Sequence, residues 1–374
     1  MKIKMSKNFV LLVVVLGVLL VLTIVVFEFL AAGQAKRYPN RQAIRFYQTY
    51  SKQLHHLRDP APKRWRLNED PRNALYTIVR EYSKENKTNI LIQGDSWGEQ
   101  FVDSKKTVSY LSTLTQTAEA GLVVAGVSSY AISPMTMQVR ILRNNFHLHP
   151  NKVIAVIDQT DLGDEICRYN PRRRVDEDKR LVAVTPEPAN STETYSLTEF
   201  FEHSKIWSSK KLGILQYIDR ALYSLTMEDR QKSPQRCTWS NIRRFLDGDF
   251  VSEEKDIFVK NLLGYIDEVF VDDGVKTLYF VTHPHRNHVD PATTSHRYQV
   301  DVSSLIRQAV DQSKWQSFIQ VVDFHVNFSQ HYPNWELEDI FRKSDKASHL
   351  TDQAFSTVYS KYIFSKVISD DDKN

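Results

Sequence analysis

Short apolar segments alternate with longer segments of helical apolar spacing over residues 71–368, and this alternation restricts the possible folds more than any other feature of the chain. Five segments have the length and composition of buried strands: 89–93, 121–125, 152–157, 277–282 and 318–323. The spacing around them predicts helices over 71–86, 98–118, 134–147, 253–270, 303–311 and 351–368. Buried strands separated by helices are typical of a parallel sheet with helices on both faces, so we expect a doubly wound α/β domain with a five-stranded parallel sheet.

The alternation stops between Leu162 and Ser252 and then resumes, which indicates an insertion over about 162–252 within a domain over 86–368. Hydrophobic residues make up 41% and charged residues 25% of the chain, as in ordinary globular proteins, and a net charge of +4 is too small to indicate a nucleic-acid partner. Cys167 and Cys237 are the two cysteines of the chain, so it has either one disulfide, in an oxidising compartment, or two free thiols.

The amino terminus contains nineteen consecutive uncharged residues, 9–27, which is close to the length that crosses a bilayer core. Three lysines precede this segment, and the positive-inside bias then leaves the amino terminus in the cytoplasm. We therefore expect a single-pass protein of the inner (cytoplasmic) membrane, with a cytoplasmic tail at 1–8, a transmembrane anchor at 9–30 and an extracytoplasmic carboxyl-terminal domain. A cleaved signal peptide is the alternative, because four small residues follow: Ala31, Ala32, Gly33 and Ala35.

Residues 31–85 predict a basic stalk followed by a lead-in helix, and residues 369–374 an acidic tail. Within the stalk, basic residues outnumber acidic ones. The excess fits a solvated stalk, and it also fits a surface held near anionic lipid headgroups or an acidic polymer.

Polar side chains that could take part in catalysis or binding follow all five predicted strands. They lie in the runs Gly94-Asp95-Ser96, Gly126-Val127-Ser128, Asp158-Gln159-Thr160-Asp161, His283-Pro284-His285 and Asp323-Phe324-His325. A further polar run at 345–351 precedes the final helix. Because the carboxyl ends of parallel strands meet at one edge of the sheet, where ligands bind, these runs together predict one functional site.

The order of these runs resembles the SGNH, or GDSL, hydrolase family over roughly residues 88–366: a Gly-Asp-Ser after the first strand, a glycine after the second and a histidine before the last helix. The resemblance implies a flavodoxin-like sheet and a serine hydrolase site without cofactor or metal. It also implies roles for five residues: Ser96 as nucleophile, His349 as base, Asp345 as the acid that orients the base, and Ser96, Gly126 and Thr160 as the oxyanion hole.

The chain departs from the family pattern at two places. Thr160 stands where the family has an asparagine, and the spacing from Asp345 to His349 is one residue longer than the usual Asp-x-x-His. The run Asp158-Gln159-Thr160-Asp161 resembles the corresponding run of membrane-anchored members of the family that handle acyl groups on envelope polysaccharides. Gly94-x-Ser96-x-Gly98 also fits the nucleophile elbow of α/β-hydrolases, but there the nucleophile follows several strands, so chain order argues against that fold.

The densest histidine cluster consists of His283, His285 and His288. It lacks a Cys or Glu partner at a familiar metal-site spacing, so we expect His283 and His285 to line the substrate cleft rather than bind zinc. His325, after the fifth strand, is the alternative to His349 as the base.

Two charged clusters have both a structural and a functional interpretation. The acidic cluster of Asp158, Asp161, Asp164 and Glu165 fits a solvated turn or a helix cap, although Asp161 is also placed to bind substrate. Residues 172–174 are three arginines, which are either a solvated charge run or, beside a cleft, an attraction for a uronic acid or a phosphate-bearing glycan.

We therefore expect an anchored extracytoplasmic serine esterase or O-acyltransferase that acts on acyl groups, acetyl above all, of a cell-envelope polysaccharide. Hydrolysis and transfer share an acyl-enzyme and differ in whether water or a sugar hydroxyl resolves it. The expected partners are the acylated glycan, the membrane and envelope biosynthesis proteins. A catalytically inactive SGNH-fold protein that binds glycans or assists envelope assembly is the second hypothesis.

Overall fold

The computed structural model describes residues 15–26, 46, 49–50, 53–54, 57, 70–184, 237, 239–246, 250–290, 302–324, 328–343 and 348–369. The chain divides into two compact units, one of residues 1–44, 60–69 and 187–236 and the other of residues 45–59, 70–186 and 237–374. In the first unit residues 15–26 form an exposed helix. Among the described helices, none combines the length and the apolar character that a bilayer-spanning helix needs.

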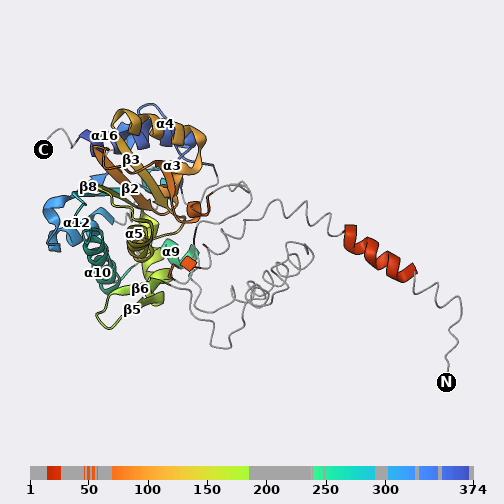
Figure 1. Cartoon of the computed structure of the whole chain (residues 1–374). Coiled ribbons are helices and arrows are strands. Elements are labelled where there is room, and N and C mark those ends of the chain that lie inside the picture. The colour runs from red at the N-terminus through yellow and green to blue at the C-terminus, as the bar shows by residue number, and fades with distance from the viewer. Residues whose placement is uncertain are drawn as a thin grey trace, which may run out of the picture. The chain divides into compact units, whose positions relative to one another are not determined.

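The second unit is built around a six-stranded sheet with the strand order β1-β3-β2-β4-β7-β8. The strands are β1 (Thr77–Arg80), β2 (Thr88–Gly94), β3 (Ala120–Gly126), β4 (Lys152–Ile157), β7 (Thr277–Thr282) and β8 (Ile319–Asp323). All neighbours pair in parallel except β1 and β3. The five predicted parallel strands are confirmed, and their order is the flavodoxin-like one in which the first strand lies between the second and the third (Figure 1).

The helix predicted over 71–86 is wrong. Only Pro71–Ala74 (η1) is helical there, and β1 (Thr77–Arg80) follows it as an edge strand antiparallel to β3. The sequence Thr-Ile-Val at the start of β1 is β-branched throughout, which favours a strand wherever a sheet edge is available for pairing. Apolar spacing along one segment could not reveal that this edge was open.

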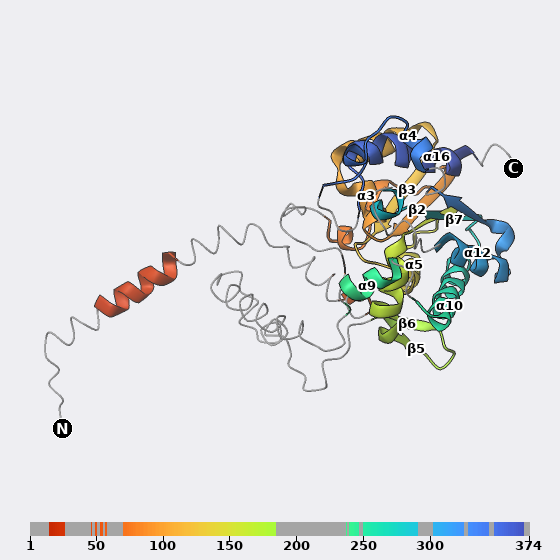
Figure 2. The same ribbon diagram turned by 180° about the vertical axis from the view of Figure 1, so that it is seen from behind.

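Helices cover both faces of the sheet, as predicted (Figures 1 and 2). One layer contains α3 (Ser96–Asp103), α4 (Lys105–Thr117), α15 (Asp352–Ala354), η6 (Phe355–Tyr359) and α16 (Ser360–Ser369), and the other contains α5 (Ile132–Phe146), α10 (Ser252–Val269) and α12 (Val302–Gln312). The single helix predicted over 98–118 is interrupted at Ser104, whose extended backbone and side-chain bond to the Thr107 N–H begin α4.

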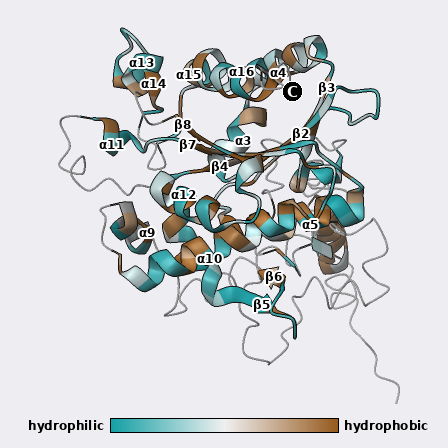
Figure 3. Ribbon diagram, turned by 90° about the vertical axis from the view of Figure 1, so that its left-hand side faces the viewer, coloured by the Kyte–Doolittle hydropathy of each residue, from teal (hydrophilic) through white to brown (hydrophobic). Residues whose placement is uncertain are grey.

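The core lies between the sheet and these layers, and Figure 3 shows hydrophobic colouring along the strands. On one face Ile90 and Ile92 pack with Trp97 and Phe101 in a cluster that reaches the carboxyl-terminal helices. Residues on the other face meet α5 and α10, and there Gln93 accepts a hydrogen bond of 2.9 Å from the hydroxyl of Tyr265. This alternation along β2 is the two-residue period of a strand buried on both faces.

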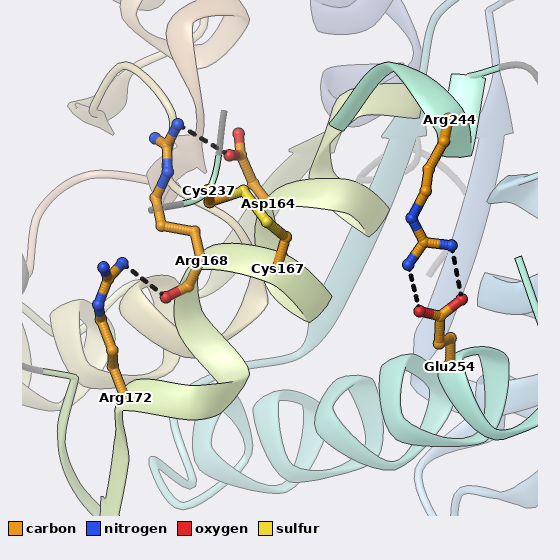
Figure 4. Close-up of a disulfide and its surroundings, with 7 residues drawn as sticks. All are labelled: Asp164, Cys167, Arg168, Arg172, Cys237, Arg244 and Glu254. Atoms are coloured by element: carbon orange, nitrogen blue, oxygen red, sulfur yellow. Dashed lines mark hydrogen bonds and ion pairs between the residues drawn. A yellow bond between two sulfur atoms is a disulfide. The ribbon is translucent and has the colours of Figure 1, made fainter. Parts of the chain in front are cut away.

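The remaining described elements of this unit are α6 (Gln159–Gly163), η2 (Asp164–Tyr169), η3 (Asn170–Arg172), β5 (Arg173–Val175), β6 (Leu181–Val184), α9 (Trp239–Leu246), α11 (Arg286–Val289), η5 (Gln316–Phe318), α13 (Phe328–His331) and α14 (Leu337–Ile340). β5 and β6 pair as an antiparallel hairpin. A disulfide joins Cys167 and Cys237 across a sequence separation of 70 residues (Figure 4). Of the two states open to these cysteines, the structure therefore contains the bridge.

Candidate active site

Ser96 is the first residue of α3 and is separated by Asp95 alone from the end of β2, which is an interior strand of the sheet. Asp95 caps the helix by accepting a hydrogen bond of 2.8 Å from the Trp97 N–H, and the Ser96 hydroxyl donates to the second oxygen of Asp95 at 3.0 Å. Gly94 makes the turn possible, because a Cβ there would lie 2.8 Å from the carbonyl oxygen of Val156. The strand therefore delivers the Ser96 hydroxyl at a sharp turn, as predicted from the Gly-Asp-Ser run.

Gly126, at the end of β3, lies against this turn. A Cβ on Gly126 would be 2.0 Å from the carbonyl carbon of Gly98, so the backbones of β3 and α3 touch directly. The Val127 N–H donates to the carbonyl oxygen of Gly94 at 3.0 Å, which joins the two strand ends. Gly126 thus lies beside the Ser96 turn, where the resemblance places the second oxyanion donor.

The loop that carries His349 is attached to α3. The buried side chain of Gln100 donates a hydrogen bond of 2.9 Å to the carbonyl oxygen of Leu350. Gln100 lies one helical turn after Ser96, so the two side chains share a face of α3. The His349 ring lies 6.3 Å from the indole ring of Trp97, measured between ring centroids. The described residues therefore bring Ser96 and His349 to the same helix.

Two other expected residues lie outside the described residues. These are Asp345, the predicted acid of the triad, and His325, the alternative base. Their roles stay predictions.

His283 and His285 follow β7 and are both buried. The His283 ring stacks on the indole of Trp97, with centroids 3.3 Å apart and planes 26° apart, and Tyr359 meets the same indole edge-on. His285 lies close enough to Asp158 to favour the charged form of that carboxyl. His283 therefore packs on the residue next to Ser96, and the contact of both histidines with a substrate stays a prediction.

Three carboxylates converge behind the turn: Asp95, Asp158 and Asp161. One oxygen from each lies within 4.8 Å of the others, and all three side chains are buried. Asp158 caps α6 through the backbone N–H groups of Thr160 and Asp161, at 2.6 and 3.0 Å, and Asp161 accepts from the Asp158 N–H at 2.9 Å. For Asp158 and Asp161 the helix-cap interpretation is therefore confirmed. The interpretation of the acidic residues of 158–165 as a solvated turn is wrong, because all four of their side chains are buried.

Burial raises the pKa of all three carboxyl groups, because a charged carboxylate is poorly solvated there. Repulsion among them raises the pKa of Asp95 and Asp161 further, whereas the hydrogen bonds from Thr160 oppose the rise at Asp158. Burial also raises the pKa of Asp164 to about 7, against the opposing charge of Arg168 at 3.2 Å (Figure 4). Buried carboxylates this close together either share protons or surround a cation. Within the described residues, Asp95, Asp158 and Asp161 form the group whose geometry could hold a metal ion. Their chemistry, hard oxygen ligands, would suit Mg²⁺ or Ca²⁺.

Thr160 is near the site, but both of its donors are engaged. Its backbone N–H and its hydroxyl both donate to Asp158, at 2.6 and 2.5 Å. An oxyanion role for Thr160 therefore requires one of these bonds to break. Asp161, predicted to bind substrate, has no surface exposed to solvent, and one of its carboxylate oxygens has no hydrogen-bond partner among the described residues.

Sequence reasoning missed Gln100 and the cap formed by Asp95. Gln100 carries a signal in its position, because a polar residue one turn after the candidate nucleophile points to the same side of a helix. The cap could have been read from the aspartate directly before Ser96. The stacking of His283 on Trp97 joins residues nearly two hundred positions apart, and no local pattern indicates it.

Neither the scan of family models nor the search of curated proteins finds a match for this chain. Among solved structures, the chain is similar to an α/β hydrolase enzyme from the metagenome of Lake Arreo, Spain, with 12% identity over 74% of this chain and 94% of the other and a TM-score of 0.37. It is also similar to an acetylxylan esterase of Geobacillus stearothermophilus, with 12% identity over 74% and 94% of the two chains and a TM-score of 0.35. A catalytic mutant of that esterase matches with 11% identity over 75% and 96%, with a TM-score of 0.37. Similarity at this level carries no argument about activity or substrate.

Proposed function

We propose that this chain is an extracytoplasmic serine esterase or O-acyltransferase of the SGNH type, acting on acetyl or related acyl groups of a cell-envelope polysaccharide. One observation carries the proposal. Ser96 begins α3 at the carboxyl end of an interior strand, and Gln100 fastens the His349 loop to that same helix. A hydroxyl and an imidazole brought to one helix turn are the components of nucleophilic acyl transfer.

In the proposed reaction the Ser96 hydroxyl breaks its hydrogen bond to Asp95. Its oxygen then attacks the acyl carbonyl carbon while His349 accepts the hydroxyl proton. Asp345 would orient His349, and the backbone N–H groups of Ser96 and Gly126 would stabilise the oxyanion. Thr160 would be a third donor once one of its two bonds to Asp158 has broken. His349 then returns the proton to the departing sugar oxygen. Water resolves the acyl-enzyme in an esterase, and a second sugar hydroxyl resolves it in an acyltransferase.

A catalytically inactive glycan-binding or envelope assembly protein is the second candidate function. The observations that favour it are the bonds made by the two hydroxyls at the site. Ser96 donates to Asp95 and Thr160 donates to Asp158, so both point toward the buried carboxylates.

The proposed location is the outer side of the cytoplasmic membrane, with residues 9–30 as the anchor. The Cys167–Cys237 disulfide supports an extracytoplasmic domain, because disulfides persist in oxidising compartments. Labelling of intact cells with a membrane-impermeant reagent, followed by fractionation, tests both parts of this location.

The proposal is tested with the full chain in detergent, by following hydrolysis of p-nitrophenyl acetate and release of acetate from acetylated polysaccharides. Ser96→Ala is expected to lower kcat/KM at least about a thousandfold. Ser109→Ala, on the exposed surface of α4, is the control and is expected to retain full activity. A folded protein without turnover on any of these substrates would favour the glycan-binding alternative.

The envelope substrate is tested in cells. Mass spectrometry of envelope glycans from cells with and without the gene is expected to show a change in acylation. Unchanged acylation would count against a role in modifying these polysaccharides.

A further inference from the structure

A groove of about 780 Å³, lined mainly by polar and charged residues, lies between α5, α10 and the β5–β6 hairpin. We infer that this groove binds an acidic oligosaccharide, a sugar chain that carries carboxylate groups. The inference rests on the proposed function and deepens it, because the ligand would be the acylated polymer itself. The volume of the groove falls within the range of roughly 300–1,000 Å³ that is usual for ligand sites.

Arginines of α5 form one wall of the groove. Arg140 and Arg143 both bind Glu268 of α10, Arg140 through its Nε at 3.0 Å and Arg143 through a terminal nitrogen at 2.5 Å. Arg143 also donates to the Glu268 carbonyl oxygen at 3.0 Å. Two guanidinium groups thus share one carboxylate, which leaves a positive charge in excess and holds both side chains in place. A guanidinium that is already ordered loses little entropy when it binds a carboxylate.

The hairpin supplies the opposite wall with Arg173, Lys179 and Arg180. Arg173 is anchored by a hydrogen bond of 2.6 Å to the hydroxyl of Ser133, whereas Lys179 and Arg180 are exposed at the hairpin turn. Five basic and three acidic side chains line the groove in all, and Arg173 is also paired with the buried carboxylate of Glu165 at 3.7 Å. The excess of positive charge therefore comes from the other four basic side chains. One arginine of the 172–174 run therefore contributes to a cleft, which matches the alternative to a solvated charge run.

The other lining groups favour a sugar over other anions. Asn144, Asn261 and Thr136 offer donors and acceptors for hydroxyl groups, and Asp176 and Asp267 offer further acceptors. These groups can accept hydrogen bonds from sugar hydroxyls, which a polyphosphate chain lacks. None of the residues that line the groove is aromatic, so it has no platform on which nucleic-acid bases could stack.

The groove begins near the carboxyl ends of the strands, where Ser96 also lies. α5 starts just after β3, and Thr136 in its second turn lines the groove, which then follows the helix to Asn144. Ser133, which anchors Arg173, lies at the start of the same helix. A polymer bound along α5 would therefore extend away from the strand ends where Ser96 lies.

The test is calorimetric titration of the full chain with tetragalacturonate, with xylotetraose as the neutral sugar of equal length and inorganic phosphate as the simple anion. Tetragalacturonate is expected to bind, and its affinity is expected to fall with added salt. Equal binding of xylotetraose, or binding of phosphate as tight as that of the oligomer, would overturn the inference, as would no binding at all.

A matched pair of charge reversals locates the site. The double variant Lys179→Glu and Arg180→Glu changes two exposed residues and is expected to weaken tetragalacturonate binding at least tenfold. Lys105→Glu with Lys106→Glu, at the exposed start of α4 in the other helix layer, is the control and is expected to bind as the unaltered chain does. Equal loss in both variants would contradict the assignment to this groove.

Binding and catalysis can fail separately in this design. Ser96→Ala is expected to bind tetragalacturonate with unchanged affinity, because Ser96 does not line the groove. Binding without esterase activity would support the groove and count against the proposed reaction, and activity without binding would do the reverse.

Discussion

At the scale of single residues, the site combines a hydroxyl at a helix start with several buried acids. Ser96 is partly buried and bonded to Asp95, whereas Asp158, Asp161 and Asp164 lie deeper. Buried carboxylates are costly unless they are protonated or compensated by a cation, so the protonation of this cluster depends on pH. The charge close to Ser96 therefore depends on pH through these carboxyl groups.

Gln100 holds the loop that carries His349 against α3, and in the proposed reaction it would position His349. Its replacement in Gln100→Leu removes the bond to the Leu350 carbonyl oxygen and releases the His349 loop from α3. We expect kcat/KM for p-nitrophenyl acetate to fall at least about tenfold, mainly through kcat, with Ser96 still reactive. Gln116→Leu, at an exposed position of α4, serves as the control. An unchanged kcat in Gln100→Leu would show that the loop does not need this bond.

The raised pKa of Asp164 makes stability depend on pH in a defined direction. The native pKa of about 7 lies above the ordinary value of 3.8, so between these values the native state holds a proton that the unfolded state has released. The stabilisation is complete below about pH 4 and is lost as pH rises through about 7, by up to about 4 kcal/mol in the free energy of unfolding.

This dependence is checked by denaturant unfolding at several pH values. Asp164→Asn is expected to flatten the decline of stability with rising pH, while Asp178→Asn, in the exposed hairpin turn, is expected to leave it unchanged. A decline of the same slope in Asp164→Asn would assign the effect to other groups.

At the scale of elements, the parallel strands were the most predictable feature. The edge strand of the sheet and the breaks between helices were the least predictable. All five parallel strands follow from apolar runs. Four of them, β2, β3, β4 and β7, are buried on both faces and need apolar residues throughout, whereas β8 is a partly exposed edge strand. The edge strand β1 and the break at Ser104 depend on pairing and capping partners that a periodic pattern does not contain. The same limit applies to the site: Ser96 and Gly126 could be predicted from local motifs, whereas the burial of Asp158 and the tether from Gln100 come from contacts between distant segments.

The packing of α3 on β3 depends on a glycine pair. A methyl group at Gly126 would lie 2.0 Å from the backbone of Gly98, where no side chain can move aside. Gly126→Ala is therefore expected to lower the free energy of unfolding by at least about 2 kcal/mol, within the range for overpacking. Gly264→Ala is the matched control, because a Cβ on this α10 glycine would meet no other atom within 4 Å. Replacing a glycine inside a helix by alanine is expected to raise the free energy of unfolding by roughly 0.5–1 kcal/mol. Equal effects in the two variants would contradict the close contact.

At the scale of the whole molecule, the disulfide links the segment after β4 to the segment before α9. It spans a sequence separation of 70 residues, so its removal restores considerable freedom to the unfolded chain. Cys167→Ala with Cys237→Ala is expected to lower the free energy of unfolding by about 2–4 kcal/mol, measured by denaturant unfolding. A reducing agent is expected to destabilise the unaltered chain and to have no effect on the double variant. A double variant as stable as the unaltered chain would exclude a structural role for the bridge.

The proposed reaction requires Ser96 to be a nucleophile that His349 activates. The most direct measurement is peptide mapping by mass spectrometry after the full chain has reacted with a serine-directed phosphonate. We predict one adduct, on Ser96, that is absent in Ser96→Ala and greatly slowed in His349→Ala. A folded chain that forms no adduct, or an adduct on Ser96 that forms equally fast in His349→Ala, would contradict these roles of Ser96 and His349.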